Sequence, residues 1–321
     1  MKLSVFSPIF WQLTLEQACE FLQSKGVPAM EVGCGGYPGK THCNPEILLN
    51  DEQKLREFTD TFKRHNVEIA ALSVHGNPVH PDPVQAKVFH DDFVNAVLLA
   101  EKLGVTRIIG FSGCPGGSPK DVTPNWVTSA WPEWFQKALD YQWNDVLIPY
   151  WKKAAAFAGE HGVTKIALEM HPGFNVYNPE TLLKLRAAVG DIIGANFDPS
   201  HLFWQGMDPV MAIRELGDAI YFFHAKDTKL EQANIARNGV LDLKGYQQLN
   251  KRSWFFCTVG YGHDTIVWNK MISELRLNGY DDVISIEHED GLMSSNEGLS
   301  KAIRFLQQAL ITEEAGTMFW A

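Results

Sequence analysis

The chain has 321 residues, 45% of them hydrophobic and 21% charged, which is the composition of a globular protein with ample apolar material for a core. Its formal net charge is -10 at pH 7. Because phosphate binding depends on Lys and Arg, this charge argues against a nucleic-acid partner held on a broad basic face.

The first half of the chain alternates apolar runs of strand length with amphipathic segments of helix length. The expected strands are residues 2–6, 29–32, 67–74 and 107–111. Apolar residues recur at a period of about 3.6 in the expected helices, which are residues 14–25, 45–65, 83–103 and 131–160, the last with a break at Pro149. Residues 123–145, after the fourth strand, interrupt this alternation and carry Trp126, Trp131, Trp134 and Trp143.

In the second half, each of four apolar runs ends in a residue that can bind a metal. These residues are Glu169, Asp198, His224 and Glu287. The expected helices are residues 179–189, 209–216, 265–277 and 296–310. Residues 227–263, after the seventh strand, form a connection long enough to act as a lid or binding element. Residues 312–321 form an apolar C-terminal tail, which we expect to dock on its own domain or on a partner.

Eight strand–helix units without a break in composition predict one α/β domain over residues 1–321, a (β/α)8 TIM barrel with long loops after strands 4 and 7. The C-terminal ends of such strands converge on one face, so the four strand-end residues can share a point. Three carboxylates and an imidazole form a mostly hard ligand set. Such a set suits Mn²⁺, Mg²⁺ or Co²⁺ better than a metal that prefers thiolate ligands. We expect one divalent ion, Mn²⁺ first, with Mg²⁺, Co²⁺ or Zn²⁺ as alternatives.

This constellation resembles the xylose-isomerase-like TIM barrels, a superfamily of sugar isomerases, sugar epimerases, inosose dehydratases and barrel-type AP endonucleases. The most specific motifs are Leu168-Glu169, Asp198-Pro-Ser-His201, His224-Ala-Lys-Asp227 and Ile286-Glu287. In the ketose 3-epimerase branch, residues like these bind one Mn²⁺ or Mg²⁺. The resemblance implies that Glu169 and Glu287 are both metal ligands and the acid/base pair. It also implies that Asp198 and His224 are ligands, and that His201 acts in catalysis by contacting a substrate oxygen.

The chemistry implied by those roles begins with removal of a proton beside a carbonyl group. A metal bound to adjacent carbonyl and hydroxyl oxygens acidifies the C–H bond and stabilises the resulting enediolate. Reprotonation from the other face gives epimerisation, reprotonation at the neighbouring carbon gives isomerisation, and loss of a β-oxygen gives elimination. Our first hypothesis is an isomerase or epimerase that acts on a free or oxidised sugar.

Three further side chains are candidate substrate contacts. His75 lies at the end of the third strand. His171 and Lys226 each lie two residues past a proposed ligand, Glu169 and His224, and so fall on the same side of an extended strand.

Two other hypotheses stay open. A lyase or dehydratase with the same site would release water or an aglycone from a 3-keto sugar, and the long connection and the tryptophans would hold the bulky substituent. A non-catalytic barrel subunit would instead support a partner through the Trp-rich segment and the apolar tail. AP endonucleases use three zinc ions and extra histidines, whereas the fourth strand here ends in Ile109-Gly-Phe-Ser-Gly113, so the sequence disfavours DNA repair.

Cysteine usage and the N-terminus bear on location. The five cysteines are odd in number, widely spaced and without a CxxC pair, so neither a disulfide framework nor a zinc ribbon is indicated. No signal sequence is recognisable, and no stretch approaches the ~20 apolar residues of a membrane span. We expect a cytoplasmic homo-oligomer, or a complex with a partner subunit, that acts on a small sugar or keto sugar away from membranes and nucleic acid.

Overall fold

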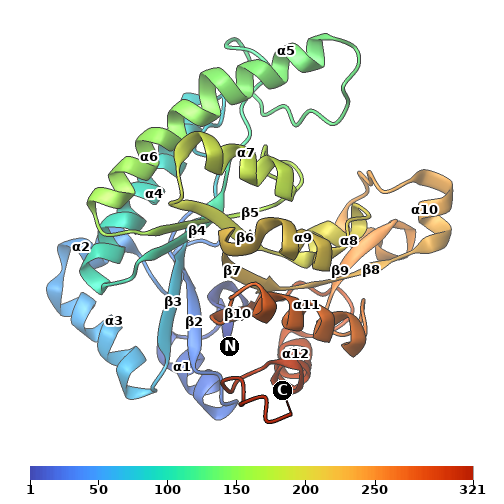
Figure 1. The fold of residues 1–321 in the computed structure, drawn as a ribbon. Coiled ribbons are helices and arrows are strands. Elements are labelled where there is room, and N and C mark those ends of the chain that lie inside the picture. The colour runs from blue at the N-terminus through green and yellow to red at the C-terminus, as the bar shows by residue number, and fades with distance from the viewer. Residues whose placement is uncertain (321) are drawn as a thin grey trace.

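A computed structural model describes residues 1–320 and contains a closed barrel of eight parallel strands surrounded by helices (Figure 1). The barrel strands are β1 (Lys2–Phe6), β2 (Ala29–Gly33), β3 (Glu68–Ser73), β4 (Arg107–Phe111), β5 (Lys165–Glu169), β6 (Ile193–Phe197), β7 (Ile220–Ala225) and β10 (Val283–Ile286). Their order around the barrel is β1-β10-β7-β6-β5-β4-β3-β2. The predicted (β/α)8 TIM barrel is therefore confirmed.

The barrel strands are apolar and almost wholly buried, because helices cover them outside and side chains fill the interior. Every residue of β2 and β6 is buried. The helices around the barrel are α1 (Leu15–Ser24), α2 (Pro45–Asn50), α3 (Glu52–Arg64), α4 (Pro83–Leu103), α5 (Trp134–Asp140), α6 (Ile148–Glu160), α7 (Pro179–Val189), α8 (Pro199–Trp204), α9 (Pro209–Leu216), α11 (Thr265–Leu277) and α12 (Ser295–Ala309). Leu22 of α1, Trp268 of α11 and Ile303 of α12 are buried in the layer between helices and barrel.

Two expected helices differ from the observed ones. The predicted helix over residues 45–65 is divided at Asp51, which is extended (φ -134°) and accepts hydrogen bonds from the backbone N–H groups of Gln53 and Lys54 at the start of α3. In residues 131–160, a π-helical segment, Tyr141–Leu147, joins α5 to α6. Pro149 causes no break: it is the second residue of α6, two residues after the π-helical segment, and the helical run continues through it.

Both predicted long connections lie after β4 and β7, at the C-terminal end of the barrel. Residues 112–133 contain no helix or strand. The connection after β7 contains an antiparallel pair, β8 (Asp227–Leu230) and β9 (Trp254–Cys257), with α10 (Gln232–Asn238) and a 3₁₀ segment (Tyr246–Lys251) between them. Figure 1 shows this pair and α10 projecting from the barrel as an arm.

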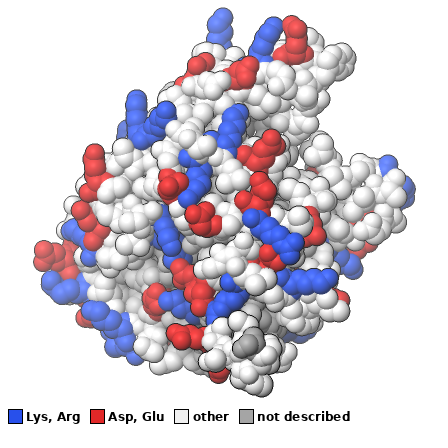
Figure 2. Space-filling view, viewed as in Figure 1, with Lys and Arg blue, Asp and Glu red and all other residues white. Residues whose placement is uncertain are grey.

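The apolar C-terminal tail is exposed. The side chains of Met318, Phe319 and Trp320 are 64%, 89% and 72% exposed, so they do not dock on the barrel. Ala321 lies outside the described residues. Figure 2 shows acidic and basic side chains interspersed over the visible face. None of the helices within residues 1–320 has both the length and the apolarity needed to cross a membrane.

Candidate metal centre

The four strand-end residues converge at the C-terminal end of the barrel. Glu169 is the last residue of β5, His224 lies in β7, and Asp198 and Glu287 directly follow β6 and β10. One ligand atom from each of the four lies within 4.8 Å of the others. The side chains of Glu169, Asp198 and His224 are no more than 2% exposed, and that of Glu287 is 16% exposed. Barrel closure thus brings together side chains that are distant in sequence.

This donor set fits a divalent cation. Within the described residues, Asp198 Oδ2 and His224 Nδ1 are buried and make no hydrogen bond of good geometry, although Lys226 lies 3.0 Å from the former and Glu287 2.9 Å from the latter. His224 Nδ1 lies 2.9 Å from Glu287 Oε2 and 3.4 Å from Glu169 Oε2. Three carboxylates and one imidazole nitrogen around a buried point are ligands that Mn²⁺, Mg²⁺, Co²⁺ and Zn²⁺ accept.

Lys226 supplies a positive charge beside these carboxylates. Its ammonium group lies 2.8 Å from Glu287 Oε2 and 3.0 Å from Asp198 Oδ2, and it is over the ring of Phe256 at 4.8 Å. Burial disfavours its charged form, but Asp198 and Glu287 outweigh burial and raise the pKa of Lys226 well above its usual value. Lys226 therefore offsets part of the negative charge and presents a cation to the cavity.

Behind His224 lies Glu31, a residue that the sequence analysis did not identify. Glu31 is fully buried in the middle of β2, and His224 Nε2–H donates to its two oxygens at 2.9 and 3.1 Å. The hydroxyl of Ser285 donates to Glu31 Oε2 at 2.7 Å, and the hydroxyl of Ser73 donates to Oε1. Because its Nε2–H is committed to Glu31, His224 presents Nδ1 to the other ligands, and carboxylates commonly orient metal-binding histidines in this way. A charged residue within an apolar strand was the signal that could have revealed Glu31.

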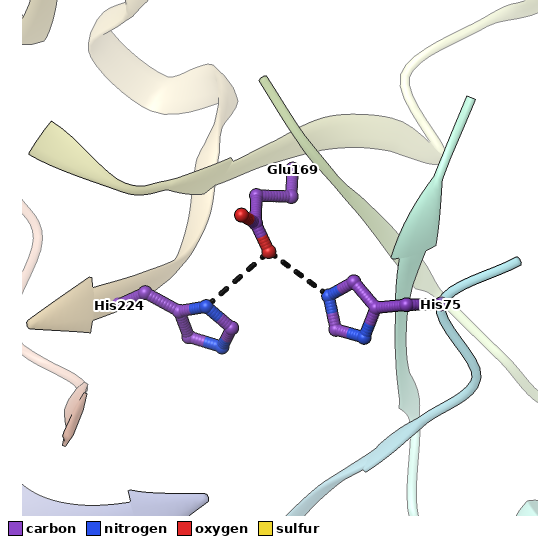
Figure 3. Close-up of side chains that lie close together, drawn as sticks. All are labelled: His75, Glu169 and His224. Carbon is purple, nitrogen blue, oxygen red and sulfur yellow. Dashed lines mark hydrogen bonds and ion pairs between the residues drawn. The ribbon is translucent and has the colours of Figure 1, made fainter. Parts of the chain in front are cut away.

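Two histidines hold Glu169 from different sides. His75 Nε2–H donates to Glu169 Oε2 at 3.0 Å, and Figure 3 shows His75 and His224 on either side of that oxygen. His201 Nε2–H donates to Glu169 Oε1 at 3.0 Å and lies 3.3 Å from Asp198 Oδ2. Both oxygens of Glu169 are thus fixed before any ligand enters.

His171 lies in the same cluster but contacts no carboxylate by a hydrogen bond. Its Nδ1–H donates to the carbonyl of Pro172 at 2.6 Å, and its ring centre lies 4.1 Å from that of His201. Burial, together with the neighbouring His201, lowers the pKa of His171 to about 3. At neutral pH this side chain is therefore an uncharged imidazole whose Nε2 is an acceptor.

The two candidate glutamate ligands are kept ionised in spite of burial. Burial opposes ionisation of Glu169, but interactions with His201, His224 and His75 outweigh it and hold its pKa well below the usual range. Burial likewise opposes ionisation of Glu287, and the Lys226 ammonium outweighs it to lower that pKa. Both carboxylates are therefore ionised at neutral pH.

The pKa values of Asp198 and His224 are both raised in this arrangement. Burial raises the pKa of Asp198 to about 6, although the ammonium of Lys226 opposes this shift. Burial disfavours charged His224, but Glu31 and Glu287 outweigh it and raise the pKa of His224 well above its usual value. A cation at this centre would compete with protons for these two side chains.

The centre opens into a cavity of about 620 Å³, a volume typical of ligand sites. Glu169 and Glu287 line it, as do the candidate contacts His75, His171 and Lys226. Its other walls are largely aromatic and include Phe6, Tyr37, Phe111, Phe174, Tyr246, Phe255 and Phe256. His201 instead lines an adjoining cavity, into which its ring faces beside that of His171.

Comparison with known proteins identifies relatives of the chain. The family model described as "Xylose isomerase-like TIM barrel" matches residues 19–309. The chain is 40% identical over 313 residues to "Uncharacterized protein YfiH" of Bacillus subtilis (strain 168), covering 97% of this chain and 99% of that protein.

Several solved structures share the fold at low sequence identity. The probable 3-DHS dehydratase AsbF involved in petrobactin synthesis from Bacillus anthracis has a TM-score of 0.66 at 17% identity, covering 96% of this chain and 99% of that one. The IOLI protein with a binding zinc atom has a TM-score of 0.66 at 19% identity, covering 97% and 98%. D-Psicose 3-epimerase with D-tagatose from Clostridium cellulolyticum H10 has a TM-score of 0.60 at 12% identity, covering 96% and 98%.

Proposed function

The chain belongs to the xylose isomerase-like TIM barrel family, and from this premise we propose that it is a divalent-metal-dependent sugar isomerase or epimerase. The observation that carries the proposal is the group formed by Glu169, Asp198, His224 and Glu287, in which one ligand atom from each lies within 4.8 Å of the others. Within the described residues, Asp198 Oδ2 and His224 Nδ1 are buried and make no hydrogen bond of good geometry. These four residues would hold the cation.

A bound cation supplies Lewis acidity, which polarises a sugar carbonyl and makes the adjacent C–H bond more acidic. The protein's own residues then move the proton. Glu169 and Glu287 both line the cavity and both have lowered pKa values, so each is in the form that can accept a proton from carbon. When one accepts the proton, the other or the same group returns one, which gives either the epimer or the isomer.

The remaining candidate residues orient the substrate and the carboxylates. His75 and His201 donate to the two oxygens of Glu169 and so fix its plane. Lys226 and the acceptor Nε2 of His171 lie at the cavity wall, where they would bind the oxygens of a sugar. The aromatic walls exclude water from the reacting carbon and offer flat faces to its C–H groups.

Solvent exchange tests this proposal. Protein loaded with Mn²⁺ is incubated in D₂O with a panel of ketohexoses, aldohexoses and 3-keto sugars, and the recovered sugars are analysed by NMR and mass spectrometry. We expect deuterium at a carbon beside the carbonyl, and its loss in Glu169→Gln and Glu287→Gln. Arg214–Glu274 is an ion pair between α9 and α11, so Glu274→Gln serves as the control that keeps exchange. Exchange that persists in both site variants would refute the assignment of the base.

A second candidate uses the same centre for elimination from a 3-keto sugar. It is supported by the aromatic lining of the 620 Å³ cavity, which would contact an apolar substituent, and by the dehydratase named among the structural neighbours. The two candidates differ in products, because elimination releases water or an aglycone and leaves an unsaturated sugar. If the site variants fold and bind no less Mn²⁺ than the unaltered protein, and no substrate of the panel is changed, the non-catalytic subunit hypothesis is favoured.

A further inference from the structure

The apolar end of the C-terminal tail is not covered by its own chain. Met318, Phe319 and Trp320 are each more than half exposed. The rings of Phe319 and Trp320 pack against each other at 5.1 Å and together form an apolar projection. Contact between such a projection and water is unfavourable, so this end of the tail has the character of a segment that binds another surface.

The start of the tail is held beside α11. The backbone carbonyl of Glu313 accepts a hydrogen bond from Arg276, in the last turn of α11. The carbonyl of Ile311 accepts one from the ammonium group of Met1 at 2.8 Å. The six residues 315–320 can span at most about 20 Å when extended. The tail can therefore reach only surfaces that lie close to α11, whether on the same chain or on a neighbouring molecule.

One such surface is a groove of about 550 Å³ between α9 and α11, which pack side by side (Figure 1). Val210 and Ile266 are its apolar lining residues, and Ile266 is 64% exposed. Leu277, 79% exposed, continues the stripe of α11 that begins at Ile266, because the two lie on one helix face. Met211 of α9 is 56% exposed next to Arg214. The outer surface of these two helices thus offers an apolar strip that could be covered.

The groove and the tail carry opposite charges. The ionisable residues that line the groove are Arg214, Lys270 and Glu274. Arg214 and Glu274 pair with each other at 2.7 Å, so the positive charge of Lys270 remains. The tail contains Glu313 and Glu314 and no Lys, Arg or His. An acidic segment that leads into an apolar end therefore complements an apolar groove with a basic residue.

A second copy of the chain accounts for both surfaces. The tail leaves the barrel at the C-terminal end of α11, and the groove lies along α11 itself. A two-fold axis beside this helix would place the tail of each protomer against the groove of the other, and the symmetry would repeat every contact twice. An unrelated partner would have to match the tail and the groove separately.

We propose that the chain forms a two-fold dimer in which the tail of each protomer lies in the groove between α9 and α11 of its partner. Phe319 and Trp320 contact the apolar lining of the groove, and the two glutamates of the tail face Lys270. Among the described residues, none lines both this groove and the metal cavity. The proposal is therefore independent of the proposed function.

The mass of the full-length chain in solution tests the dimer. Analytical ultracentrifugation over a range of concentrations should give twice the 36.1 kDa of one chain. Replacing Phe319 and Trp320 together by Ala should raise the dimer dissociation constant about 10-fold or more, because buried aromatic residues contribute strongly to interfaces. Trp131→Ala, at an 80% exposed tryptophan after β4, is the control and should change nothing. A chain that is monomeric at every concentration, or a dimer that persists equally in the tail variant, would overturn the proposal.

An exchange of charge tests whether the tail pairs with this groove. Lys270→Glu should weaken the dimer, and so should Glu313→Lys combined with Glu314→Lys, because each places like charges together. A mixture of the two variant proteins should associate again, since in the mixed dimer each groove faces a tail of opposite charge. Variants that dimerise as tightly as the unaltered chain, or a mixture that stays monomeric, would show that the tail does not bind this groove.

Discussion

Replacing Glu31 with Gln should weaken metal binding although Glu31 is not itself a ligand. The change keeps the shape of the side chain but gives one end a donor. Three donors now converge on the carboxylate: His224 Nε2–H at 2.9 and 3.1 Å, the Ser285 hydroxyl at 2.7 Å and the Ser73 hydroxyl. The amide NH₂ of Gln would face at least one of them, and beside Nε2 it would favour the tautomer that carries its proton on Nδ1.

The expected loss follows from the position of that proton. To bind a cation, His224 must keep its proton on Nε2 and lose the proton on Nδ1, and a Gln amide beside Nε2 would raise the free energy of that form. Loss of such a supporting carboxylate typically lowers metal affinity by about 10- to 100-fold, or about 1.4 to 2.8 kcal/mol of binding free energy. Calorimetric titration of metal-free protein with Mn²⁺ measures this directly, beside a thermal melt that reports whether the variant is folded.

Controls separate orientation from general damage. Glu274→Gln alters another carboxylate with a protein partner, Arg214, between α9 and α11, and should leave Mn²⁺ affinity unchanged. Ser285→Ala removes one donor to Glu31 but preserves the bond to His224, so its effect should be smaller than that of Glu31→Gln. A folded Glu31→Gln protein that binds Mn²⁺ as tightly as the unaltered protein would show that Glu31 does not orient His224.

Three further predictions concern the ion, the pH and a helix start. Mn²⁺ at 100 times its dissociation constant should stabilise the protein by about 2.7 kcal/mol in thermal melts, an effect that EDTA reverses, and unchanged melts would argue against a site. Mn²⁺ affinity should rise as the pH increases through 6, because protons compete with the cation for Asp198, whose pKa is about 6, and for His224, whose pKa is raised. An affinity that does not change with pH would contradict this. Asp51→Ala should destabilise the fold by about 1 kcal/mol in urea unfolding because α3 loses its cap, and Asp60→Ala, within the same helix, should change stability less.

The barrel and the convergence of the four strand-end residues were predictable because both leave short-range signals. The alternation of strand-length and helix-length segments predicted the barrel. Glu169 and Glu287 each come at the end of an apolar run, and the C-terminal ends of the strands are where barrel enzymes carry their active sites. Glu31 was missed because the prediction concentrated on strand ends, whereas this carboxylate lies in mid-strand and its partners Ser73 and Ser285 come from β3 and β10. Only barrel closure brings the three together.

The arm after β7 was predicted as a long connection but without its strands. The segment Asp227–Leu230 is short and largely polar, so it lacks the alternation of apolar and polar residues that marks a strand. Their pairing is fixed by tertiary contacts: Asp227 accepts hydrogen bonds from the backbone N–H groups of Gly260, Gly262 and His263, and also from the His263 ring. Contacts that join residues more than thirty positions apart leave no local pattern in the sequence.

The same closure that assembles the centre also concentrates negative charge in the barrel. Glu31, Glu169, Asp198 and Glu287 come from four strands and approach one another only when those strands pair. Burial without compensation would oppose closure, and Lys226 with the neighbouring histidines supplies only part of the opposing charge. A dication that binds the folded barrel and not the unfolded chain would offset the remainder. Metal binding should therefore contribute to closure of the C-terminal end of the barrel as well as to the chemistry proposed for it.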